Sequence, residues 1–411
     1  SVIMNIISNS SFWLFIQPCF VFQIEIHEIS ALFLFIKIYK VNHIYSNMTI
    51  KNLDKKIRAY ALKNAISHEG KANPGAVLSA LFNEGLEKSG VKEVMPKINE
   101  IVGEVSSLSL SKQEKEFEKL KEFVSEREVR EGLPELPNAE NGVVMRLAPS
   151  PSGPLHLMHA INLSLNYLYV KKYGGTLYIR IEDTNSETIY PGAYEMIQEE
   201  AKWLTDNAGF VKMVVQSDRM DLYYGYAVAL IEKDAAYICE CSGDNFRELA
   251  KSKKDCPCRS KSIKKNIRDW EKMINKQGFK EGEAVLRFKS DMKHKNPAMR
   301  DFPLARINET KHPKQGNKYR VWPLMNLSVT VDDIETGMTH IIRGKDHKDN
   351  AERQKMIYEI FDKEYPWAAF TGMTNFIGMK FSTREMKQGI EEGKYSGWDD
   401  SKLSTVASLK K

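Results

Sequence analysis

The clearest pattern of apolar and polar positions lies between Val143 and Asp183, where it predicts a strand, a helix and a second strand. VVMRL is a short apolar run of strand length, and INLSLNYLYV carries apolar residues at helical spacing before Gly174-Gly175 ends the helix. In TLYIRIED, apolar and polar residues alternate as they do in a strand. Together these elements predict a βαβ unit with two parallel strands.

Before this unit the apolar pattern is helical. Apolar residues share one helical face at spacings of three and four at Ile50, Leu53, Ile57 and Ala61. Asn73-Pro74 has the form of an N-cap followed by proline at the first helical position. A further helix is expected to begin at Ser111, because Ser111 and Glu114 fit a capping box. Residues 48–131 are therefore predicted to form a small helical domain.

After a proline-containing linker, strand-like and helical segments alternate along the chain and predict an α/β fold with a parallel sheet. A strand is expected from Val211, and the sheet is expected to resume within YRVWPLMNLSVTVDD after a basic, mixed insertion. The expected order is linker, first half of the sheet domain, inserted α+β domain, second half and final loop-containing segment, at 132–141, 142–238, 239–318, 319–372 and 373–411.

The loop between the first strand and its helix has the composition of a nucleotide site. Prolines and a glycine fill it at Pro149, Pro151, Gly153 and Pro154. The helix is expected to begin near His156, with His159 on the same first turn, and a helix N-terminus attracts phosphate through its unpaired N–H groups. The alternative is that both histidines are ordinary capping or solvated residues.

Charged residues are expected where parallel strands end. Glu182 and Asp183 follow the second strand, and Arg343 closes a short apolar run before Gly344. Ligands of open α/β sheets bind at this carboxyl edge. For Glu182, an ion pair with a nearby Arg or Lys is an equally good interpretation. Near the end of the chain, the cationic loop at Lys380–Arg384 has the character of a cover for polyphosphate.

Four of the five cysteines form two C-x-C pairs separated by fourteen residues, at Cys239, Cys241, Cys256 and Cys258. Four thiolates brought together by a short helix can hold one tetrahedral Zn²⁺, and a site with four protein ligands is structural. Clustering of this kind favours a reducing compartment over a disulfide framework. Four free cysteines are the alternative.

The first 47 residues differ from the rest of the chain. No charged residue occurs before Glu25, and Phe, Ile, Trp and Val dominate. Length alone fits a transmembrane helix or signal anchor. Polar residues interrupt the segment, however, and no basic stretch precedes it. We therefore expect residues 1–47 to be translated upstream sequence, with the working protein starting at Met48 and no association with a membrane.

Composition adds little to this picture. The 411 residues carry a net charge of +6, with 42% hydrophobic residues, which suffices for two or three domains with proper cores. A small basic excess suits an RNA partner, but it is equally typical of a solvated surface.

An ordered set of motifs resembles one known family. The motifs are ANPGAV, RLAPSPSGPLHLMHA, RIEDT, the two cysteine pairs, KHKNPAMRD, VWPLMN, HIIRGKDH and GIEEGKYSGWDD. Together they resemble the class I aminoacyl-tRNA synthetases of the glutamyl and glutaminyl branch, in the archaeal glutamyl form. The resemblance implies a Rossmann-like catalytic domain with an inserted domain for the tRNA acceptor end, in a cytoplasmic enzyme.

The resemblance also implies a reaction and the residues that serve it. Glutamate attacks the α-phosphorus of ATP, and the resulting adenylate is transferred to the 3′ end of tRNA(Glu), or also of tRNA(Gln). By similarity, ATP and its Mg²⁺ meet His156, His159, Lys380, Ser382, Thr383 and Arg384. The substrate glutamate is similarly expected to meet Arg146, Ala148, Ser150, Glu182 and Arg343, with the two arginines on its side-chain carboxylate and Glu182 on its ammonium.

The sequence departs from the family pattern at several points. Met158 stands between the histidines where glycine is usual, Asn185 replaces an aspartate, and Thr383-Arg384 replaces the more usual Lys-Ser. The chain also ends at Lys411, before the β-barrel domains that read the anticodon in relatives. Three hypotheses follow: an active ligase of glutamate or glutamine, a remnant that binds tRNA or zinc without forming adenylate, and a membrane-anchored protein.

Overall fold

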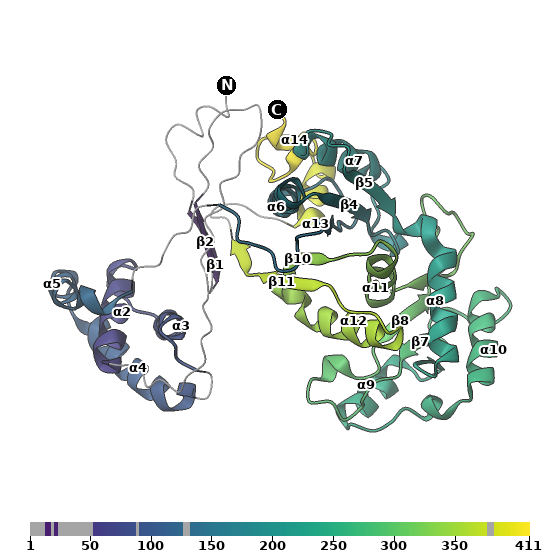
Figure 1. Cartoon of the computed structure of the whole chain (residues 1–411), viewed down its shortest axis with the longest axis horizontal. Coiled ribbons are helices and arrows are strands. Elements are labelled where there is room, and N and C mark those ends of the chain that lie inside the picture. Colours follow the sequence, from purple (N-terminus) through teal and green to yellow (C-terminus); the bar gives the residue numbers. More distant parts are fainter. Residues whose placement is uncertain (1–12, 18–19, 24–51, 88–89, 126–131, 376–381) are drawn as a thin grey trace. The chain divides into compact units, whose positions relative to one another are not determined.

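The computed structural model describes residues 13–17, 20–23, 52–87, 90–125, 132–375 and 382–411. They belong to two units, one ending at Pro134 and the other beginning at Glu135 (Figure 1). The expectation that residues 1–47 are upstream sequence falls largely outside the described residues. Within that segment, β1 (Trp13–Gln17) and β2 (Phe20–Gln23) pair as antiparallel strands. None of the helices in the described ranges combines the length and apolar character needed to cross a bilayer.

The first unit contains a small bundle of helices. Its elements are α2 (Leu53–Ile66), α3 (Pro74–Asn83), α4 (Val91–Ser107), α5 (Leu110–Leu120) and the 3₁₀ turn η2 (Lys121–Phe123). The core includes Ile57 and Ala61, which confirms the predicted face of α2. Asn73 caps α3 as predicted, since its side chain accepts the Gly75 N–H at 2.8 Å. The predicted capping box at Ser111 is wrong, because the N-cap of α5 is Ser109 and Ser111 is already the second residue of the helix.

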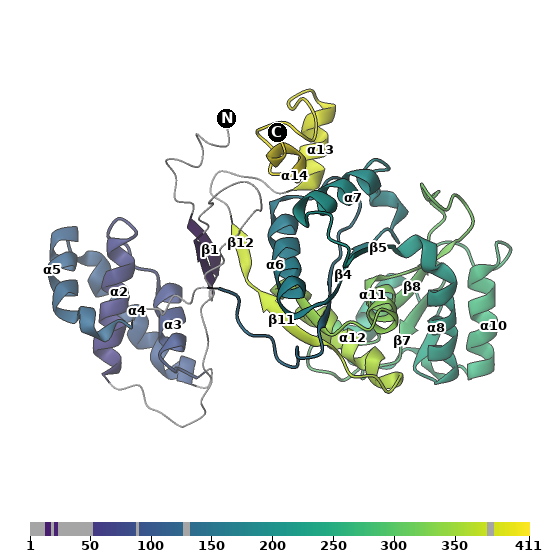
Figure 2. The ribbon, with the colours of Figure 1, turned by 45° about the horizontal axis from the view of Figure 1, so that its top comes forward.

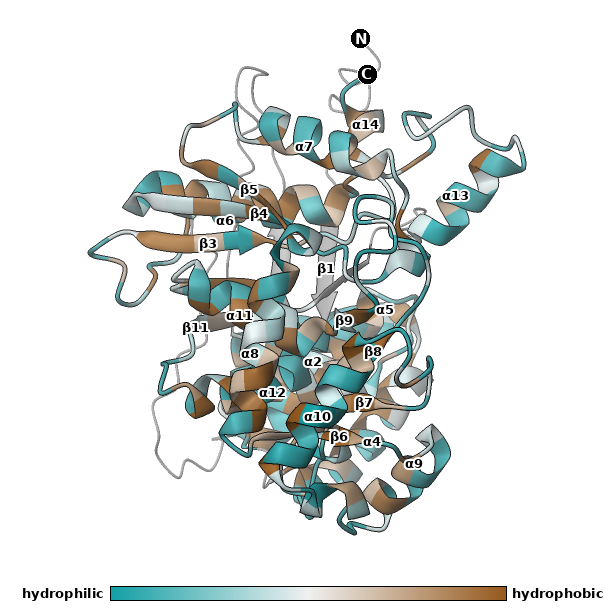
Figure 3. Ribbon diagram, turned by 90° about the vertical axis from the view of Figure 1, so that its right-hand side faces the viewer, coloured by the Kyte–Doolittle hydropathy of each residue, from teal (hydrophilic) through white to brown (hydrophobic). Residues whose placement is uncertain are grey.

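The predicted βαβ unit is confirmed in the second unit. Its elements, with the next helix and strand, are β3 (Val143–Leu147), α6 (Leu157–Tyr173), β4 (Gly175–Ile181), α7 (Ala193–Leu204) and β5 (Val211–Val215). The three strands are parallel in the order β3-β4-β5. Figure 2 shows α6 alongside β4, and Figure 3 shows the apolar stretches of the three strands side by side. A Cβ at Gly175 would lie 2.0 Å from the Val143 oxygen, so glycine is required there.

A second parallel pair adjoins the first sheet. It consists of β10 (His340–Gly344), the turn η7 (Lys345–His347), α12 (Lys348–Ile360) and β11 (Trp367–Thr371). The Thr339 N–H donates to the Val144 oxygen at 3.1 Å, which brings β10 beside β3. The carboxyl ends of β3, β4 and β10 therefore share one edge. This arrangement is the Rossmann-like α/β fold predicted from the sequence.

Between the two parallel sheets, the chain forms an antiparallel sheet in the order β6-β7-β8-β9. Its strands are β6 (Ala236–Cys239), β7 (Val285–Phe288), β8 (Pro303–Ile307) and β9 (Val321–Pro323). Helices of this region are α8 (Met220–Glu232), α9 (Gly243–Lys251) and α10 (Ile263–Ile274). The insertion is therefore longer than the expected 239–318, because β6 begins before its first residue and β9 follows its last residue.

The expectation that the parallel sheet resumes within YRVWPLMNLSVTVDD is wrong. Only β9 is a strand there, and it pairs with β8 in the antiparallel sheet. Residues Met325–Glu335 form the helix α11, of which eight successive residues from Asn326 to Asp333 are buried. A segment buried on all sides loses the amphipathic period that separates a helix from a strand, so its β-branched residues suggested a strand.

Short elements complete the second unit: η3 (Ser186–Thr188), η4 (Gln216–Arg219), η5 (Pro257–Ser260), η6 (Pro297–Met299), β12 (Met373–Asn375), α13 (Thr383–Glu391) and α14 (Val406–Leu409). In Figure 3, α13 is mostly hydrophilic. Its buried Met386 packs with Trp398 and Leu403, and Tyr190 from before α7 packs against this cluster. The last thirty residues are thereby held to the first parallel sheet region.

Candidate active site

The two histidines cap the helix that follows the proline-rich loop. His156 is the N-cap of α6, and its Nδ1 accepts the His159 N–H at 3.4 Å, while the His159 Nδ1 accepts the His156 N–H at the same distance. The rings stack with centroids 3.7 Å apart. The capping interpretation is thus confirmed. Since both Nδ1 atoms accept, each neutral ring carries its proton on Nε2, which makes Nε2 a donor.

Both histidines are neutral at pH 7 in this structure. Burial lowers the pKa of His156 to about 4. Burial, followed by the charge of His156, lowers the pKa of His159 well below its usual value. Neutral imidazoles with Nε2–H donors, placed at a helix N-terminus, offer hydrogen bonds to an anion without a proton transfer.

The loop before α6 is braced by two other parts of the chain. Leu155 donates its N–H to the buried Glu200 carboxylate of α7 at 2.6 Å. The Val406 N–H donates to the Leu155 oxygen at 2.7 Å, and the Leu157 N–H donates to the Ser404 oxygen at 2.9 Å. The segment that carries His156 is therefore fixed by α7 on one side and by residues 404–406 on the other.

The residues predicted to bind glutamate meet at the carboxyl edge of the parallel strands. Arg146 lies on β3, Arg343 lies on β10, and Glu182 directly follows β4. The backbone N–H of Glu182 donates to the Pro149 oxygen at 2.9 Å, which ties the end of β4 to the proline-rich loop. Burial and then the nearby Arg146 guanidinium lower the pKa of Arg343. Two buried guanidinium groups are therefore close enough to influence each other here.

A buried carboxylate that the sequence analysis missed holds one of these arginines. Asp333 on α11 accepts Arg146 Nε at 2.8 Å and Arg180 Nη1 at 2.5 Å. Arg180 Nη2 in turn lies 3.0 Å from Glu182 Oε1, so the alternative of a local ion pair for Glu182 is confirmed. The acidic residues of the VDD sequence were visible, but no local pattern pairs Asp333 on α11 with Arg146, which lies 187 residues earlier in the chain.

Asp183, which the sequence places at the carboxyl edge together with Glu182, fixes the end of β4. It is fully buried and accepts the N–H of Ser217 at 2.8 Å and the hydroxyl of Tyr194 at 2.7 Å. His312, also fully buried, has its Nε2 2.9 Å from the Asp183 backbone oxygen. Because His312 comes from the turn between β8 and β9, it joins the antiparallel sheet to the edge that carries Glu182.

The remaining predicted residues lie around the same loop. Ala148 is half-buried and Ser150 is exposed. Lys380 lies outside the described residues. Ser382 is the N-cap of α13, and Thr383 is so close to Gly153 that a Cβ there would lie 2.9 Å from Thr383 Cγ2. Arg384, on the first turn of α13, is exposed. The start of α13 therefore contacts the proline-rich loop.

The four clustered cysteines come together as predicted. Their sulfur atoms all lie within 4.8 Å of one another, with Cys241 and Cys256 at 3.5 Å and Cys241 and Cys258 at 3.9 Å. Four sulfurs at about 2.3 Å from a tetrahedral zinc ion would be about 3.8 Å apart. The cluster has this size, so the residues fit a four-thiolate zinc site without an open position.

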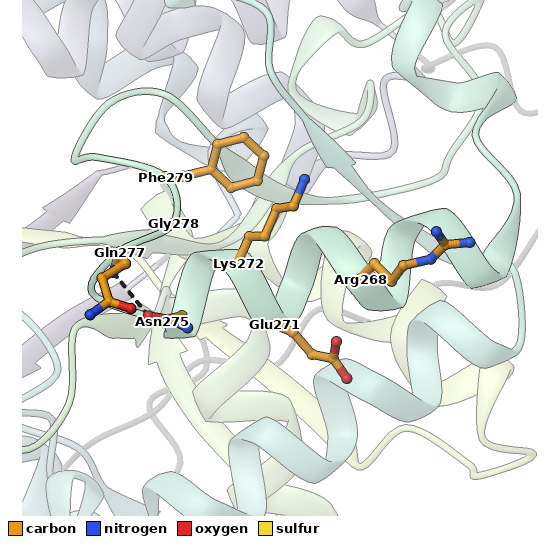
Figure 4. Close-up of a pocket in the computed structure, with 7 residues that line it drawn as sticks. All are labelled: Arg268, Glu271, Lys272, Asn275, Gln277, Gly278 and Phe279. Atoms are coloured by element: carbon orange, nitrogen blue, oxygen red, sulfur yellow. Dashed lines mark hydrogen bonds between the residues drawn. The ribbon is translucent and has the colours of Figure 1, made fainter.

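A separate pocket lies at the end of α10 and contains none of the predicted site residues (Figure 4). Its lining residues are Arg268, Glu271, Lys272, Asn275, Gln277, Gly278 and Phe279. The Gln277 N–H donates to Asn275 Oδ1 at 2.9 Å, which closes the turn after the helix. No buried polar group points into this pocket among its described lining residues, which are mostly exposed.

Comparison with known proteins identifies related chains. Residues 142–411 match the family described as tRNA synthetases class I (E and Q), catalytic domain. A glutamate–tRNA ligase of Methanocaldococcus jannaschii is 48% identical over 87% of this chain and 64% of its own length. One of Pyrococcus abyssi is 45% identical over 86% of this chain and 63% of its own length. The chain thus spans just under two thirds of these relatives.

Among solved structures, a glutamate tRNA ligase from Elizabethkingia meningosepticum, crystallised with its amino acid, is similar with a TM-score of 0.42 and 24% identity. The similarity covers 56% of this chain and 49% of that one.

Proposed function

Because this chain belongs to the class I tRNA synthetases of the glutamyl and glutaminyl type, we propose that it catalyses the ATP-dependent activation of glutamate and its transfer to tRNA. The observation that carries this proposal is the pair of buried guanidinium groups, Arg146 and Arg343, beside Glu182 at one edge of the sheet. Two cations and one anion in this arrangement suit an amino acid with a carboxylate side chain and an ammonium group.

In the proposed first step, the α-carboxylate of glutamate attacks the α-phosphorus of ATP and pyrophosphate leaves. The protein needs to hold these atoms in line and to stabilise the charge that develops on the phosphates. We assign His156 and His159 to that task, since their Nε2 atoms are donors at the N-terminus of α6. The start of α13, with Ser382, Thr383 and Arg384, adjoins the same loop, and Lys380 precedes it in sequence. Mg²⁺, when bound with ATP, would supply further positive charge.

In the proposed second step, the 3′ end of tRNA accepts the glutamyl group. The inserted region, with its antiparallel sheet and basic α10, is the proposed support for the acceptor end. The four cysteines would hold a structural Zn²⁺ in that region. We propose tRNA(Glu) as the partner, with tRNA(Gln) as an additional substrate to be tested.

The test is pyrophosphate exchange into ATP with glutamate and tRNA(Glu). The chain is expected to support exchange, and replacing both His156 and His159 with alanine is expected to reduce it by about 100-fold or more, since electrostatic contacts made in the transition state are lost. The matched control is His68→Ala, because His68 is exposed on the helical unit. This control should keep the wild-type rate.

Absence of exchange with wild-type chain above the level of the double alanine variant would overturn the proposal and favour a remnant that only binds tRNA or zinc. A parallel assay with glutamine in place of glutamate identifies the amino acid. A higher exchange rate with glutamine would instead assign the chain to glutaminyl-tRNA synthesis.

A further inference from the structure

The two arginines of the candidate amino-acid site are held by groups of different charge. Arg146 binds both oxygens of Asp333, with Nε–Oδ1 at 2.8 Å and Nη2–Oδ2 at 3.1 Å. Arg343 instead donates from Nη1 to the amide oxygen of Gln354 at 2.9 Å. Among the described residues, no carboxylate lies within ion-pair distance of Arg343. Its positive charge is therefore oriented but not neutralised.

The orientation of Gln354 follows from its neighbours. It lies on α12 and is 1% exposed. Its Oε1 accepts from Arg343 Nη1 and also, at 3.3 Å, from the Tyr365 hydroxyl. If the amide were turned over, its N–H groups would face the N–H groups of Arg343. In this orientation the amide nitrogen of Gln354 has no hydrogen-bond partner within the described part of the chain, which is unfavourable for a buried donor.

The ion pairs around the site leave out Arg343. Arg146, Arg180 and Arg219 form ion pairs with Glu182, Asp332 and Asp333, whereas Arg343 forms none with any described residue. The adjacent His347 adds no charge at pH 7, because burial and then the charge of Arg343 lower its pKa. A buried unbalanced cation is unfavourable until an anion binds beside it. Arg343 therefore offers a bound carboxylate a charge that no described residue pairs with.

We propose that Gln354 is a specificity-determining positioning residue, which selects a carboxylate side chain over an amide side chain by holding Arg343 through a neutral oxygen. The proposal rests on the proposed function, since it concerns the amino acid bound there. A carboxylate at position 354 would neutralise Arg343 internally. The site would then repel the carboxylate side chain of glutamate, and its affinity for glutamine, whose side-chain amide is neutral, would fall less than its affinity for glutamate.

The test uses three single variants of the full chain: Gln354→Glu, Gln354→Met and the control Gln277→Glu. Gln277 is exposed at the pocket beyond α10, so its change adds the same charge away from the site. Binding of glutamate and of glutamine is measured separately by isothermal titration calorimetry, and circular dichroism checks folding. Gln354→Met removes the acceptor without adding a charge.

We expect Gln354→Glu to lower the ratio of glutamate to glutamine affinity by about tenfold or more, because a new charge opposes the substrate carboxylate at close range. Gln354→Met should weaken glutamate binding by about fivefold or more, since Arg343 loses its anchor, while the preference for glutamate remains. Gln277→Glu should match the wild-type chain.

An unchanged affinity ratio in folded Gln354→Glu overturns the inference while leaving the proposed function intact. If Gln354→Glu does not fold, the affinity of Gln354→Met for glutamate is the test. An affinity equal to that of the wild-type chain then overturns the inference. Absence of glutamate binding by the wild-type chain is a distinct result that overturns the proposed function and the inference together.

Discussion

Met158 separates the two histidines that cap α6 and is partly exposed on the first turn of the helix. We expect Met158→Gly and Met158→Ala both to raise the rate of pyrophosphate exchange by about tenfold, because the methionine side chain keeps ATP from approaching the backbone and a misplacement of about 1 Å can cost about 100-fold in rate. The alanine variant is needed because glycine also lowers helix stability by about 1 kcal/mol, whereas alanine removes the side chain without this effect. Equal or lower rates in both variants would show that Met158 is no obstacle.

The sequence predicts the location of a single site residue only where that residue lies at the end of a recognisable strand. Arg343 was assigned to the carboxyl edge from the short apolar run that precedes it. Asp333 and Gln354 could not be found in this way, because their roles depend on partners from other elements. The ion pair of Asp333 with Arg146 spans 187 residues. No local pattern encodes such a pairing.

Glu200 carries a pH-dependent share of stability. Burial raises its pKa from an ordinary 4.5 to about 7. With a raised pKa, its favourable contribution is complete below pH 4.5 and is lost as the pH rises through 7, by up to about 3 kcal/mol. Glu200→Gln should therefore reduce the loss of stability between pH 5.5 and 8.5, measured by denaturant unfolding.

Exposed Glu195, on the same helix α7, provides the control for this experiment, since Glu195→Gln should leave the pH dependence unchanged. The comparison between variants is needed because His156, with its lowered pKa, acts in the opposite sense and loses stability as the pH falls from 6.5 towards 4. A parallel pH profile for Glu200→Gln and wild type would contradict the assignment.

Two of the four cysteines lie at the end of β6 and just after it, and the other two lie at the start of η5 and within it. A zinc ion would join these two elements, which α9 separates in the sequence. Cys241→Ser should abolish stoichiometric zinc, measured by elemental analysis, and lower the unfolding midpoint by about 5–10 °C, because a structural metal contributes several kcal/mol of folding free energy. Exposed Ser252→Ala, next to α9, is the control and should retain zinc. Chelation without any change in unfolding would reject the zinc assignment.

The elements were predictable wherever apolar spacing was regular. The β3-α6-β4 unit was found because its strands are short and its helix ends at two glycines. The interpretation of α11 failed because all of its residues from Asn326 to Asp333 are buried, so the pattern showed neither period. The N-cap of α5 is Ser109 instead of the predicted Ser111, a difference within the usual uncertainty of helix ends.

For the whole molecule, the sequence indicated a helical domain, a parallel α/β fold and an insertion, and the structure has all three kinds of element. The limits of the insertion were harder to predict. Its sheet recruits β6 and β9 from segments that looked like parts of the parallel sheet. Only the pairing of Ala236 with Phe288 and of Val321 with Ile307 reveals that these strands belong to the antiparallel sheet.

The hydrogen bonds of residues 404–406 to Leu155 and Leu157 have a consequence for the order of events during synthesis. A ribosome releases the chain from its N-terminus, so the histidine loop emerges about 250 residues before the segment that braces it. The helical unit and the first parallel strands are free to fold early. The N-terminal end of α6 acquires this support only after residues 404–406 have been synthesised and have left the exit tunnel, so this part of the candidate site cannot be complete when the histidine loop first emerges.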